Sequence, residues 1–231
     1  MVQHIVTERT GNGDPYAAVK RRDMQTALAL LPELEALLSQ KDDRVYWALK
    51  AAATGNVLDS AVGLSVDIGC FGAEFETPFA VCDIDAFTDK LKTAKTMLVI
   101  GDNTGETVFD GLLLKQFPSL RIRYAVRHAP VLNDATLEIA KESGLAAYAD
   151  ILSTGCGVPG VLLHECSEEF LTVFHHADIV ISKGQGNYET LSDSPRDLFF
   201  LLKAKCPVIA RTLGVRLNDF VFRYGAGKQA Q

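Results

Sequence analysis

The chain has 231 residues, of which 48% are hydrophobic and 23% charged, and its formal net charge is -6. That length allows one sizeable core with a smaller subdomain, and the acidic balance without a basic run argues against nucleic acid as a partner. Every apolar stretch is shorter than the roughly 18 residues of a membrane span, and the first residues lack the apolar core of a signal peptide, so we expect no membrane association and a cytoplasmic location.

Residues 1–95 predict a helical subdomain. Apolar side chains recur three and four positions apart in residues 27–38 and again in residues 45–52. The segment CDIDAF at 82–87 imitates the DxD motif of haloacid dehalogenase phosphatases, but it lies too close to the next acidic motif for that class. We therefore expect Asp83 or Asp85 to cap a helix. The cysteines are scattered without a CxxC pair, which predicts free thiols.

Residues 96–231 alternate apolar runs with amphipathic stretches, which predicts a doubly wound, mostly parallel sheet between helices. The run at 97–100 lacks polar alternation, as in a strand that is buried on both faces. The expected strands are MLVIG from Met97, IRYAVR from Ile122, ADILS from Ala149, DIVIS from Asp178 and PVIAR from Pro207, with DFVFRY from Asp219 as a last edge strand.

Polar side chains follow each expected strand, where open α/β sheets place their ligands. In strand order these are Asp102, Asn103 and Glu106; Arg127, His128, Asn133 and Asp134; Ser153, Thr154 and Gly155; and Lys183, Asn187 and Glu189. Carboxylate and carboxamide oxygens suit a hard cation such as Mg²⁺ or Mn²⁺. Fixed positive charge and glycine-rich backbone that opens a helix suit a phosphate group.

Each motif also has a purely structural interpretation. A helix cap followed by a turn would explain Asp102, a helix cap would explain Asp134, and a solvated charge would explain Lys183. The GxGxxG match at 155–160 is weak, because the following strand ends in Lys183 rather than in the acid that a dinucleotide site requires. We therefore reject a nicotinamide site and expect a phosphate-binding or turn role for this loop.

Together, the segments IGDNTGE, VRHAPVLNDAT, STGCGVPG and ISKGQGNYET resemble the DUF89 family of metal-dependent damage-control phosphatases, in its ARMT1-like group. Similarity continues in TGNGDPY near the start, GNVLD at 55–59 and KCPVIARTLGV near the end. The resemblance implies a three-layer α/β/α domain with a Rossmann-like sheet in the order 3-2-1-4-5-6, its last strand antiparallel, joined to a small helical domain. It also implies that the metal ligands are Asp102, Asn103 and Asp134.

The function implied by the resemblance is a metal-dependent phosphatase for small phosphorylated metabolites, such as sugar phosphates, nucleotides or damaged cofactor phosphates. The cation would be Mn, Mg, Co or Ni. Lys183 and Arg127 would neutralise phosphate oxygens, and Glu106 would orient the attacking water. The remaining substrate-binding candidates are Ser153, Thr154, Gly155, Asn187 and Glu189. Two alternatives stay open: a phosphometabolite-binding or regulatory protein without turnover, and a metal-dependent methyltransferase.

The chain departs from this family in two places. Similar members carry further helical sequence before the TGNGDPY segment, so we expect a helical subdomain that is incomplete at its N-terminus. Such a subdomain would expose an apolar face that favours a homodimer. The segment ARTLGV at 210–215 also lacks the lysine of the RTxK motif of another branch, so the sugar-phosphate preferences of that branch do not carry over.

Overall fold

The computed structural model describes residue 5 and residues 8–58 and 68–227. In this part of the chain the strands form one seven-stranded sheet in the order β1-β7-β6-β5-β2-β3-β4. The strands are β1 (Phe79–Cys82), β2 (Thr96–Ile100), β3 (Arg121–Val126), β4 (Asp150–Ser153), β5 (Ile179–Lys183), β6 (Leu198–Lys203) and β7 (Phe220–Gly225). Only β6 and β7 pair antiparallel among these strands. The predicted order is confirmed from β4 to β7, and β1 extends the sheet.

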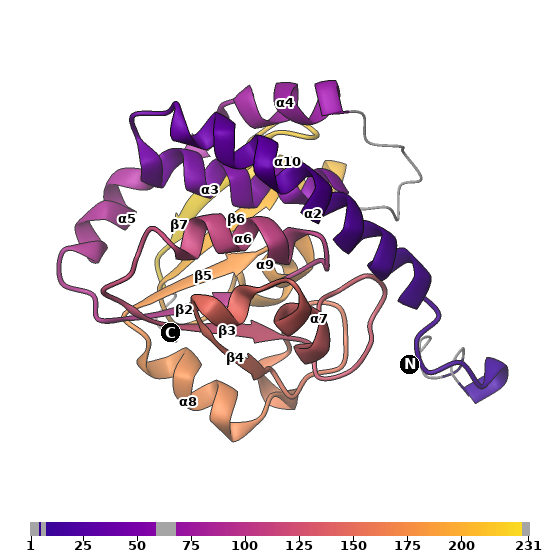
Figure 1. The fold of residues 1–231 in the computed structure, drawn as a ribbon. Helices are drawn as coiled ribbons and strands as arrows, with labels where there is room; N and C mark the ends of the chain where they lie inside the picture. The colour runs from indigo at the N-terminus through magenta and orange to yellow at the C-terminus, as the bar shows by residue number, and fades with distance from the viewer. Residues whose placement is uncertain (1–4, 6–7, 59–67, 228–231) are drawn as a thin grey trace.

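Helices cover both faces of the sheet, which gives the predicted three layers (Figure 1). They are α2 (Ala17–Ser39), α3 (Arg44–Thr54), α4 (Ile68–Glu76), α5 (Ile84–Leu91), α6 (Glu106–Leu114), α7 (Leu137–Glu142), α8 (Glu168–His176), α9 (Gln185–Leu191) and α10 (Pro207–Leu213), with short 3-10 turns η1 (Gly55–Leu58), η3 (Leu145–Ala147) and η4 (Leu163–Glu165). Among the described residues, no helix is long and apolar enough to cross a membrane.

The alternation of side chains along β2 explains the two cores. Met97 and Val99 pack with α3, α5 and α6, whereas Leu98 and Ile100 pack with α8, α9 and α10. All four side chains are at most 1% exposed, so β2 is buried on both faces, as its sequence predicts. The carboxyl end of β2 therefore lies in the centre of the sheet, between β3 and β5.

One of the predicted strands is wrong, and two strands of the sheet were not predicted. PVIAR forms the start of helix α10, with Pro207 in its first turn and Gly214 in the left-handed conformation at its end. These are the residues that favour a helix start and stop, and they outweigh a short apolar run. The strand that follows β5 is LFFLLK at 198–203, a continuous apolar run from which periodicity alone cannot separate strand from helix. The segment assigned only to helices also contributes β1.

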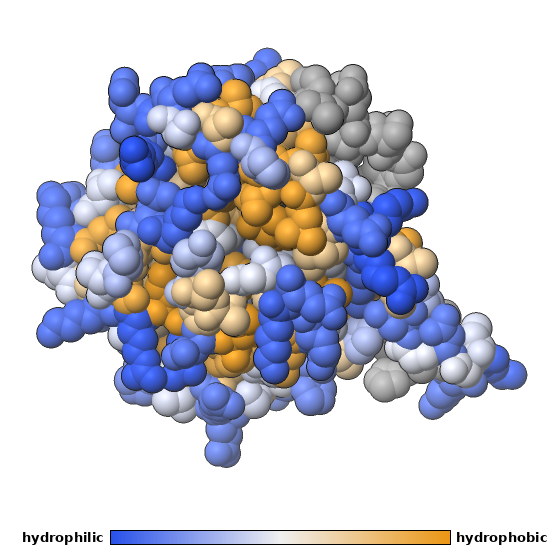
Figure 2. Space-filling view, in the orientation of Figure 1, coloured by the Kyte–Doolittle hydropathy of each residue, from blue (hydrophilic) through white to orange (hydrophobic). Residues whose placement is uncertain are grey.

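Helices α2 and α4 form an outer layer. Leu30 and Leu34 of α2 and Phe71 of α4 share an apolar cluster with Val108 and Phe109 of α6. Leu28, on the outer side of α2, is 44% exposed, and Figure 2 shows apolar surface in the region that α2 crosses in Figure 1. This surface is compatible with the expected homodimer, which stays a prediction.

The segment at 82–87, which imitates the DxD motif, leads into helix α5, as predicted. Asp83 stands at the N-cap position of α5, but its carboxylate accepts from the backbone N–H of Tyr224, 2.7 Å away, instead of capping the helix. Free thiols are found at Cys82, Cys156 and Cys166 and at Cys206, also as predicted. The side chain of Cys70 lies outside the described residues.

Lys50 of α3 is an unusual component of the core. It is 0% exposed, and within the described residues its Nζ has no hydrogen-bond partner. The nitrogen lies 2.9 Å from the centroid of the Phe220 ring, whose face attracts a cation. Burial lowers the pKa of Lys50 to about 7, against a smaller upward effect of Glu74. An unfolded lysine keeps its proton up to about pH 10.5, so this side chain destabilises the fold near neutral pH.

We predict that Lys50→Met stabilises the protein, and more strongly at pH 7 than at pH 9. Between these pH values the folded wild type binds fewer protons than the unfolded chain, so its stability rises with pH, and the advantage of the variant should shrink by about 2 kcal/mol. Urea unfolding at both pH values measures this difference. Lys141→Met, at an exposed position, serves as the control. A pH-independent difference for Lys50→Met would contradict the prediction.

Candidate active site

The loops after β2 and β3 are hydrogen-bonded to each other. The N–H of Thr104 donates to the carbonyl of Asn133 at 2.9 Å, and the N–H of Ala135 donates to the carbonyl of Asp102 at 2.8 Å. Asn103 and Asp134 are partners in an isolated antiparallel bridge. The structure therefore places the three predicted metal ligands, Asp102, Asn103 and Asp134, on two paired segments at the carboxyl edge of the sheet.

Arg127 joins two of these side chains. Its Nε donates to Asp134 Oδ2 at 2.6 Å, and its Nη2 lies 3.7 Å from Asp102 Oδ1. The same Nη2 donates to Asn187 Oδ1 at 2.9 Å, while the Asn187 amide donates to the carbonyls of Gly101 and Lys183. Asn187 thus fixes the guanidinium to the ends of β2 and β5. Within the described residues, Arg127 Nη1 is buried without a hydrogen-bond partner, an arrangement that suits an anion.

Gly184 allows β5 to reach the site. Its backbone has a φ of +78°, and a Cβ at this position would overlap the carboxylate of Asp102. A glycine is required here for both reasons. The end of β5 therefore lies directly against the end of β2, at the switch point where the chain turns from one half of the sheet to the other.

The candidate ligands form a buried and electrostatically strained group. Burial raises the pKa of Asp102, and the neighbouring Asp134 and Glu106 raise it further, against an opposing effect of Arg127. Burial also raises the pKa of Asp134, although Arg127 opposes the shift. Carboxylates held together in this way are stabilised by an added cation.

The donor atoms fit a hard divalent metal. The Asn103 amide nitrogen donates to Asp102 Oδ2 at 3.1 Å and to Glu106 Oε1 at 2.9 Å, which directs its amide oxygen elsewhere. Among the described residues, no three His, Cys, Asp or Glu side chains are grouped as ligands of one ion. A metal in this position would therefore depend on the Asn103 oxygen together with Asp102 and Asp134, an all-oxygen set that suits Mg²⁺ or Mn²⁺.

Lys183 faces α6 rather than the edge of the sheet. It shares a face of β5 with Ile179 and Ile181, which belong to the core on the α6 side. Its Nζ donates to Glu106 Oε2 at 2.7 Å and to Asp110 Oδ1 at 2.5 Å, and the side chain is 0% exposed. Burial alone would lower the pKa of Lys183, but Asp110 and Glu106 outweigh this and raise it. Lys183 therefore stays charged, with its charge balanced from α6.

Glu106 has both carboxylate oxygens occupied. Oε1 accepts from Asn103 and, at 2.5 Å, from the amide of Asn56, while Oε2 accepts from Lys183. The hydrogen bond from Asn103 to Glu106 suits a residue that orients the Asn103 amide. The role of water activation assigned to it from the sequence stays a prediction.

Two residues of this network escaped the sequence analysis. Asn56 lies in the GNVLD segment, whose similarity to the family was noted without a role. Asp110 accepts from both Lys183 and Tyr124 Oη, and burial raises its pKa to about 6. Its spacing of four residues from Glu106 places both acids on one face of α6, and this is the signal that could have identified it.

The loop after β4 uses its polar atoms internally. Ser153 Oγ accepts from the N–H of Gly155 at 3.0 Å, and Thr154 Oγ1 accepts from the N–H of Cys156 at 3.2 Å. Gly155 has a φ of +77°, and a Cβ there would overlap the backbone of Ser167. His128, which follows Arg127 in the chain, contacts this loop because its N–H donates to the carbonyl of Cys156. The substrate-binding role of Ser153, Thr154 and Gly155 stays a prediction.

Glu189 lies on the exposed side of α9. Its Oε1 accepts from Gln185 Nε2 at 2.8 Å, one turn earlier on the same helix. Within the described residues, no hydrogen bond or ion pair joins Glu189 to Asp102, Asn103 or Asp134.

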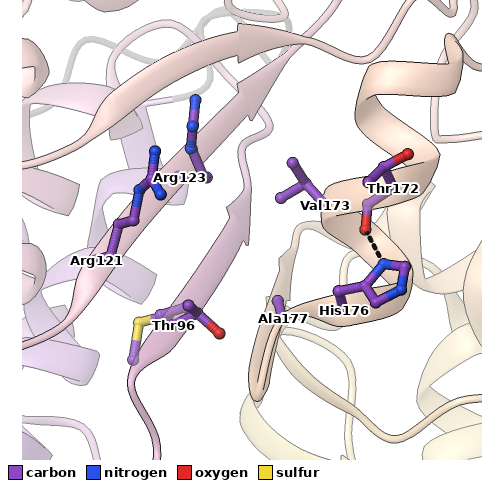
Figure 3. Close-up of a pocket in the computed structure, with 8 residues that line it drawn as sticks. Thr96, Arg121, Arg123, Thr172, Val173, His176 and Ala177 are labelled. Atoms are coloured by element: carbon purple, nitrogen blue, oxygen red, sulfur yellow. Dashed lines mark hydrogen bonds between the residues drawn. The ribbon is translucent and has the colours of Figure 1, made fainter.

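A separate pocket of about 200 Å³ lies at the opposite edge of the sheet, between β3 and α8 (Figure 3). Arg121 and Arg123 extend from β3, and His176 at the end of α8 bonds to the carbonyl of Thr172. The two arginines lie 3.9 and 3.4 Å from Asp150, which offsets their charge. The pocket is formed at the amino ends of β2 and β3, so it is remote from Asp102 and Asp134.

We predict that Lys183→Met destabilises the fold by about 3 to 5 kcal/mol, because it leaves the buried Glu106 and Asp110 without their cation. Guanidinium unfolding monitored by circular dichroism measures the loss. Lys92→Met, which removes an exposed pair with Asp89, should keep an unfolding midpoint close to that of the wild type. Equal midpoints for the two variants would show that the buried ion pairs are not formed.

Comparison with known proteins supports the family resemblance that the sequence motifs indicate. The model of the family described as "Damage-control phosphatase ARMT1-like domain" matches residues 1–221. A damage-control phosphatase of Pyrococcus horikoshii is 36% identical over 211 residues, covering 89% of this chain and 72% of that protein. A damage-control phosphatase of Archaeoglobus fulgidus is 33% identical over 229 residues, covering 95% of this chain and 79% of that protein.

The fold is also similar to a solved structure. The crystal structure of a DUF89 family protein from Pyrococcus horikoshii superimposes with a TM-score of 0.84 at 32% identity, covering 95% of this chain and 78% of that chain. The family match extends over more than nine-tenths of the sequence and includes every element that carries the candidate site. The chain therefore belongs to the ARMT1-like family of damage-control phosphatases.

Proposed function

We propose that this phosphatase hydrolyses small phosphate monoesters with a divalent cation, Mn, Mg, Co or Ni, held by Asp102, Asn103 and Asp134. The observation that carries the proposal is the guanidinium of Arg127, which lies between Asp102 and Asp134 and keeps Nη1 without a partner among the described residues. A site for a cation and a buried donor for an anion are thereby adjacent. Phosphoryl transfer depends on this combination.

A bound divalent ion would polarise a phosphate oxygen and lower the pKa of a water molecule. The protein supplies binding and orientation. Arg127 donates to non-bridging phosphate oxygens, and Asn187 prevents its guanidinium from rotating. Glu106 orients Asn103, and Lys183 compensates the charge of Glu106, so both act through the amide rather than on the phosphate. This arrangement modifies the roles expected from sequence, in which Lys183 contacts the phosphate and Glu106 the water.

The substrate class follows from the family and the site together. Relatives in the same family carry the name damage-control phosphatase, which supports small phosphorylated metabolites, including abnormal or damaged ones, as substrates. Sugar phosphates, nucleotides and cofactor phosphates all present the same dianionic group to Arg127. A panel of these compounds, each assayed with Mn²⁺, Mg²⁺, Co²⁺ and Ni²⁺, tests the proposal. Phosphate release from none of them with any of these metals would contradict it and favour a phosphometabolite-binding protein.

We predict that Asp134→Asn lowers kcat/KM by at least about 100-fold at a fixed metal concentration, because it removes one of two charges that hold the cation and the partner of Arg127. The change keeps the size of the side chain and creates no cavity. Asp89→Asn on the exposed surface of α5 is the matched control and should keep wild-type kinetics. Wild-type turnover by Asp134→Asn at saturating metal would exclude Asp134 as a ligand.

A further inference from the structure

The TGNGDPY segment at 10–16 has no role in the site described above, although it is one of the similarities to the family. In the structure it forms a turn organised by Asp14. The N–H of Tyr16 donates to Asp14 Oδ1 at 3.0 Å, and the N–H of Asp14 donates to Asn12 Oδ1 at 3.1 Å. The second oxygen, Asp14 Oδ2, accepts from Lys20 Nζ at 3.1 Å. The turn therefore holds one ammonium group, and Lys20 is only 2% exposed.

The packing of α2 determines where this ammonium lies. Glu35, near the end of α2, pairs with Lys115 just after the end of α6 at 2.6 Å. Between Lys20 and Glu35 α2 rises by about 22 Å, whereas α6 rises by only about 14 Å from Glu106 to Lys115. Since the two helices share one apolar cluster, α2 extends past the first residue of α6 by more than one turn. Asp102 and Asn103 lie just before that residue in the chain, and Asp134 pairs with Asn103.

The surroundings of helix α7 agree with this direction. The pKa of Glu138 is lowered by its own backbone N–H and by Thr136, with further contributions from Lys141 and Lys20. Asp134 and Glu138 lie just before and at the start of α7, and Ile139 of α7 packs against the α2 cluster. Helix α2 thus packs close to the start of α7, which follows Asp134 in the chain, while Arg127 contacts Asp134 from the end of β3.

We propose that Lys20, held by Asp14, binds the phosphate group of the substrate beside Asp134. This inference rests on the proposed phosphatase function. An ammonium has three N–H donors, and within the described residues the Lys20 ammonium donates a hydrogen bond to Asp14. Lys20 and Arg127 would donate hydrogen bonds to the phosphate from two sides. The helical segment would then supply part of the substrate site, which otherwise belongs to the α/β domain.

A structural role makes a different prediction about the metal. If Lys20 only positioned Asp134, its removal would weaken metal binding. If it binds phosphate, its removal takes a positive charge away from the cation site, so metal affinity should stay the same or increase. Phosphate affinity should fall in this second case. The two affinities, measured separately, therefore distinguish the roles.

The experiment is calorimetric titration of the full chain with Mn²⁺ alone and then with inorganic phosphate in the presence of Mn²⁺. Lys20→Met should weaken phosphate binding about 10- to 100-fold, the usual effect of a charge-assisted hydrogen bond. Lys20→Arg, which keeps the charge, should restore most of the affinity. Lys115→Met breaks the ion pair at the other end of α2 and should bind phosphate like the wild type. Lys20→Gln replaces Lys20→Met if circular dichroism shows that the methionine variant does not fold.

Kinetics with a phosphate monoester provide a second measurement, in which Lys20→Met should raise KM by a similar factor. Unchanged phosphate affinity in a folded Lys20 variant overturns the inference, and so does a loss of Mn²⁺ affinity that accounts for the whole effect. If the wild type binds phosphate through Lys20 but releases none from any ester, the phosphatase proposal fails and the binding role of Lys20 stands. If the wild type does not bind phosphate with Mn²⁺ at all, the inference fails.

Discussion

The ion pair between Lys183 and Glu106 is the interaction on which the geometry of the site depends. It joins the last residue of β5 to the first residue of α6, and both side chains are at most 1% exposed. Glu106 accepts a hydrogen bond from the Asn103 amide and so fixes its orientation, and Asp110 forms a second ion pair with the Lys183 ammonium. A buried charge is costly unless its partners are complete, so this network has few alternative arrangements. The amide of Asn103 is thereby held in place before any ligand binds.

A second set of interactions organises the anion side in the same way. Arg127 is held by Asp134 and Asn187, and Asn187 is held by the backbone at the ends of β2 and β5. One nitrogen of the guanidinium has no partner among the described residues. Protein groups that are oriented before the reaction need no reorganisation as charge develops on the phosphate. Burial raises the pKa values of Asp102 and Asp134, so their ionised forms cost the unliganded protein stability. A ligand that binds these carboxylates would restore this stability.

Much of the fold could be predicted from the sequence because β2 and its neighbours are buried on both faces and carry unmistakable apolar runs. The errors occurred where such runs are ambiguous, at β6 and α10, and there Pro207 and Gly214 were the better signals. Asp102 and Asn103 could be located from the end of β2 alone. The position of Asp134 beside them depends on pairing between two loops, which no periodicity records. The orientation of Lys183 follows from the alternation along β5, but its partners Glu106 and Asp110 become apparent only when α6 is placed over that face.

The central claim is that Asp102, Asn103 and Asp134 bind one divalent cation, and anomalous diffraction from crystals grown with Mn²⁺ tests it most directly. The account predicts an anomalous peak within about 2.0 to 2.6 Å of an oxygen of each of the three side chains, with the Asn103 amide oxygen facing the ion. Crystals of Asp134→Asn grown under the same conditions should show a weaker peak or none. A Mn²⁺ ion bound elsewhere, with these three side chains more than about 6 Å from it, would contradict the account.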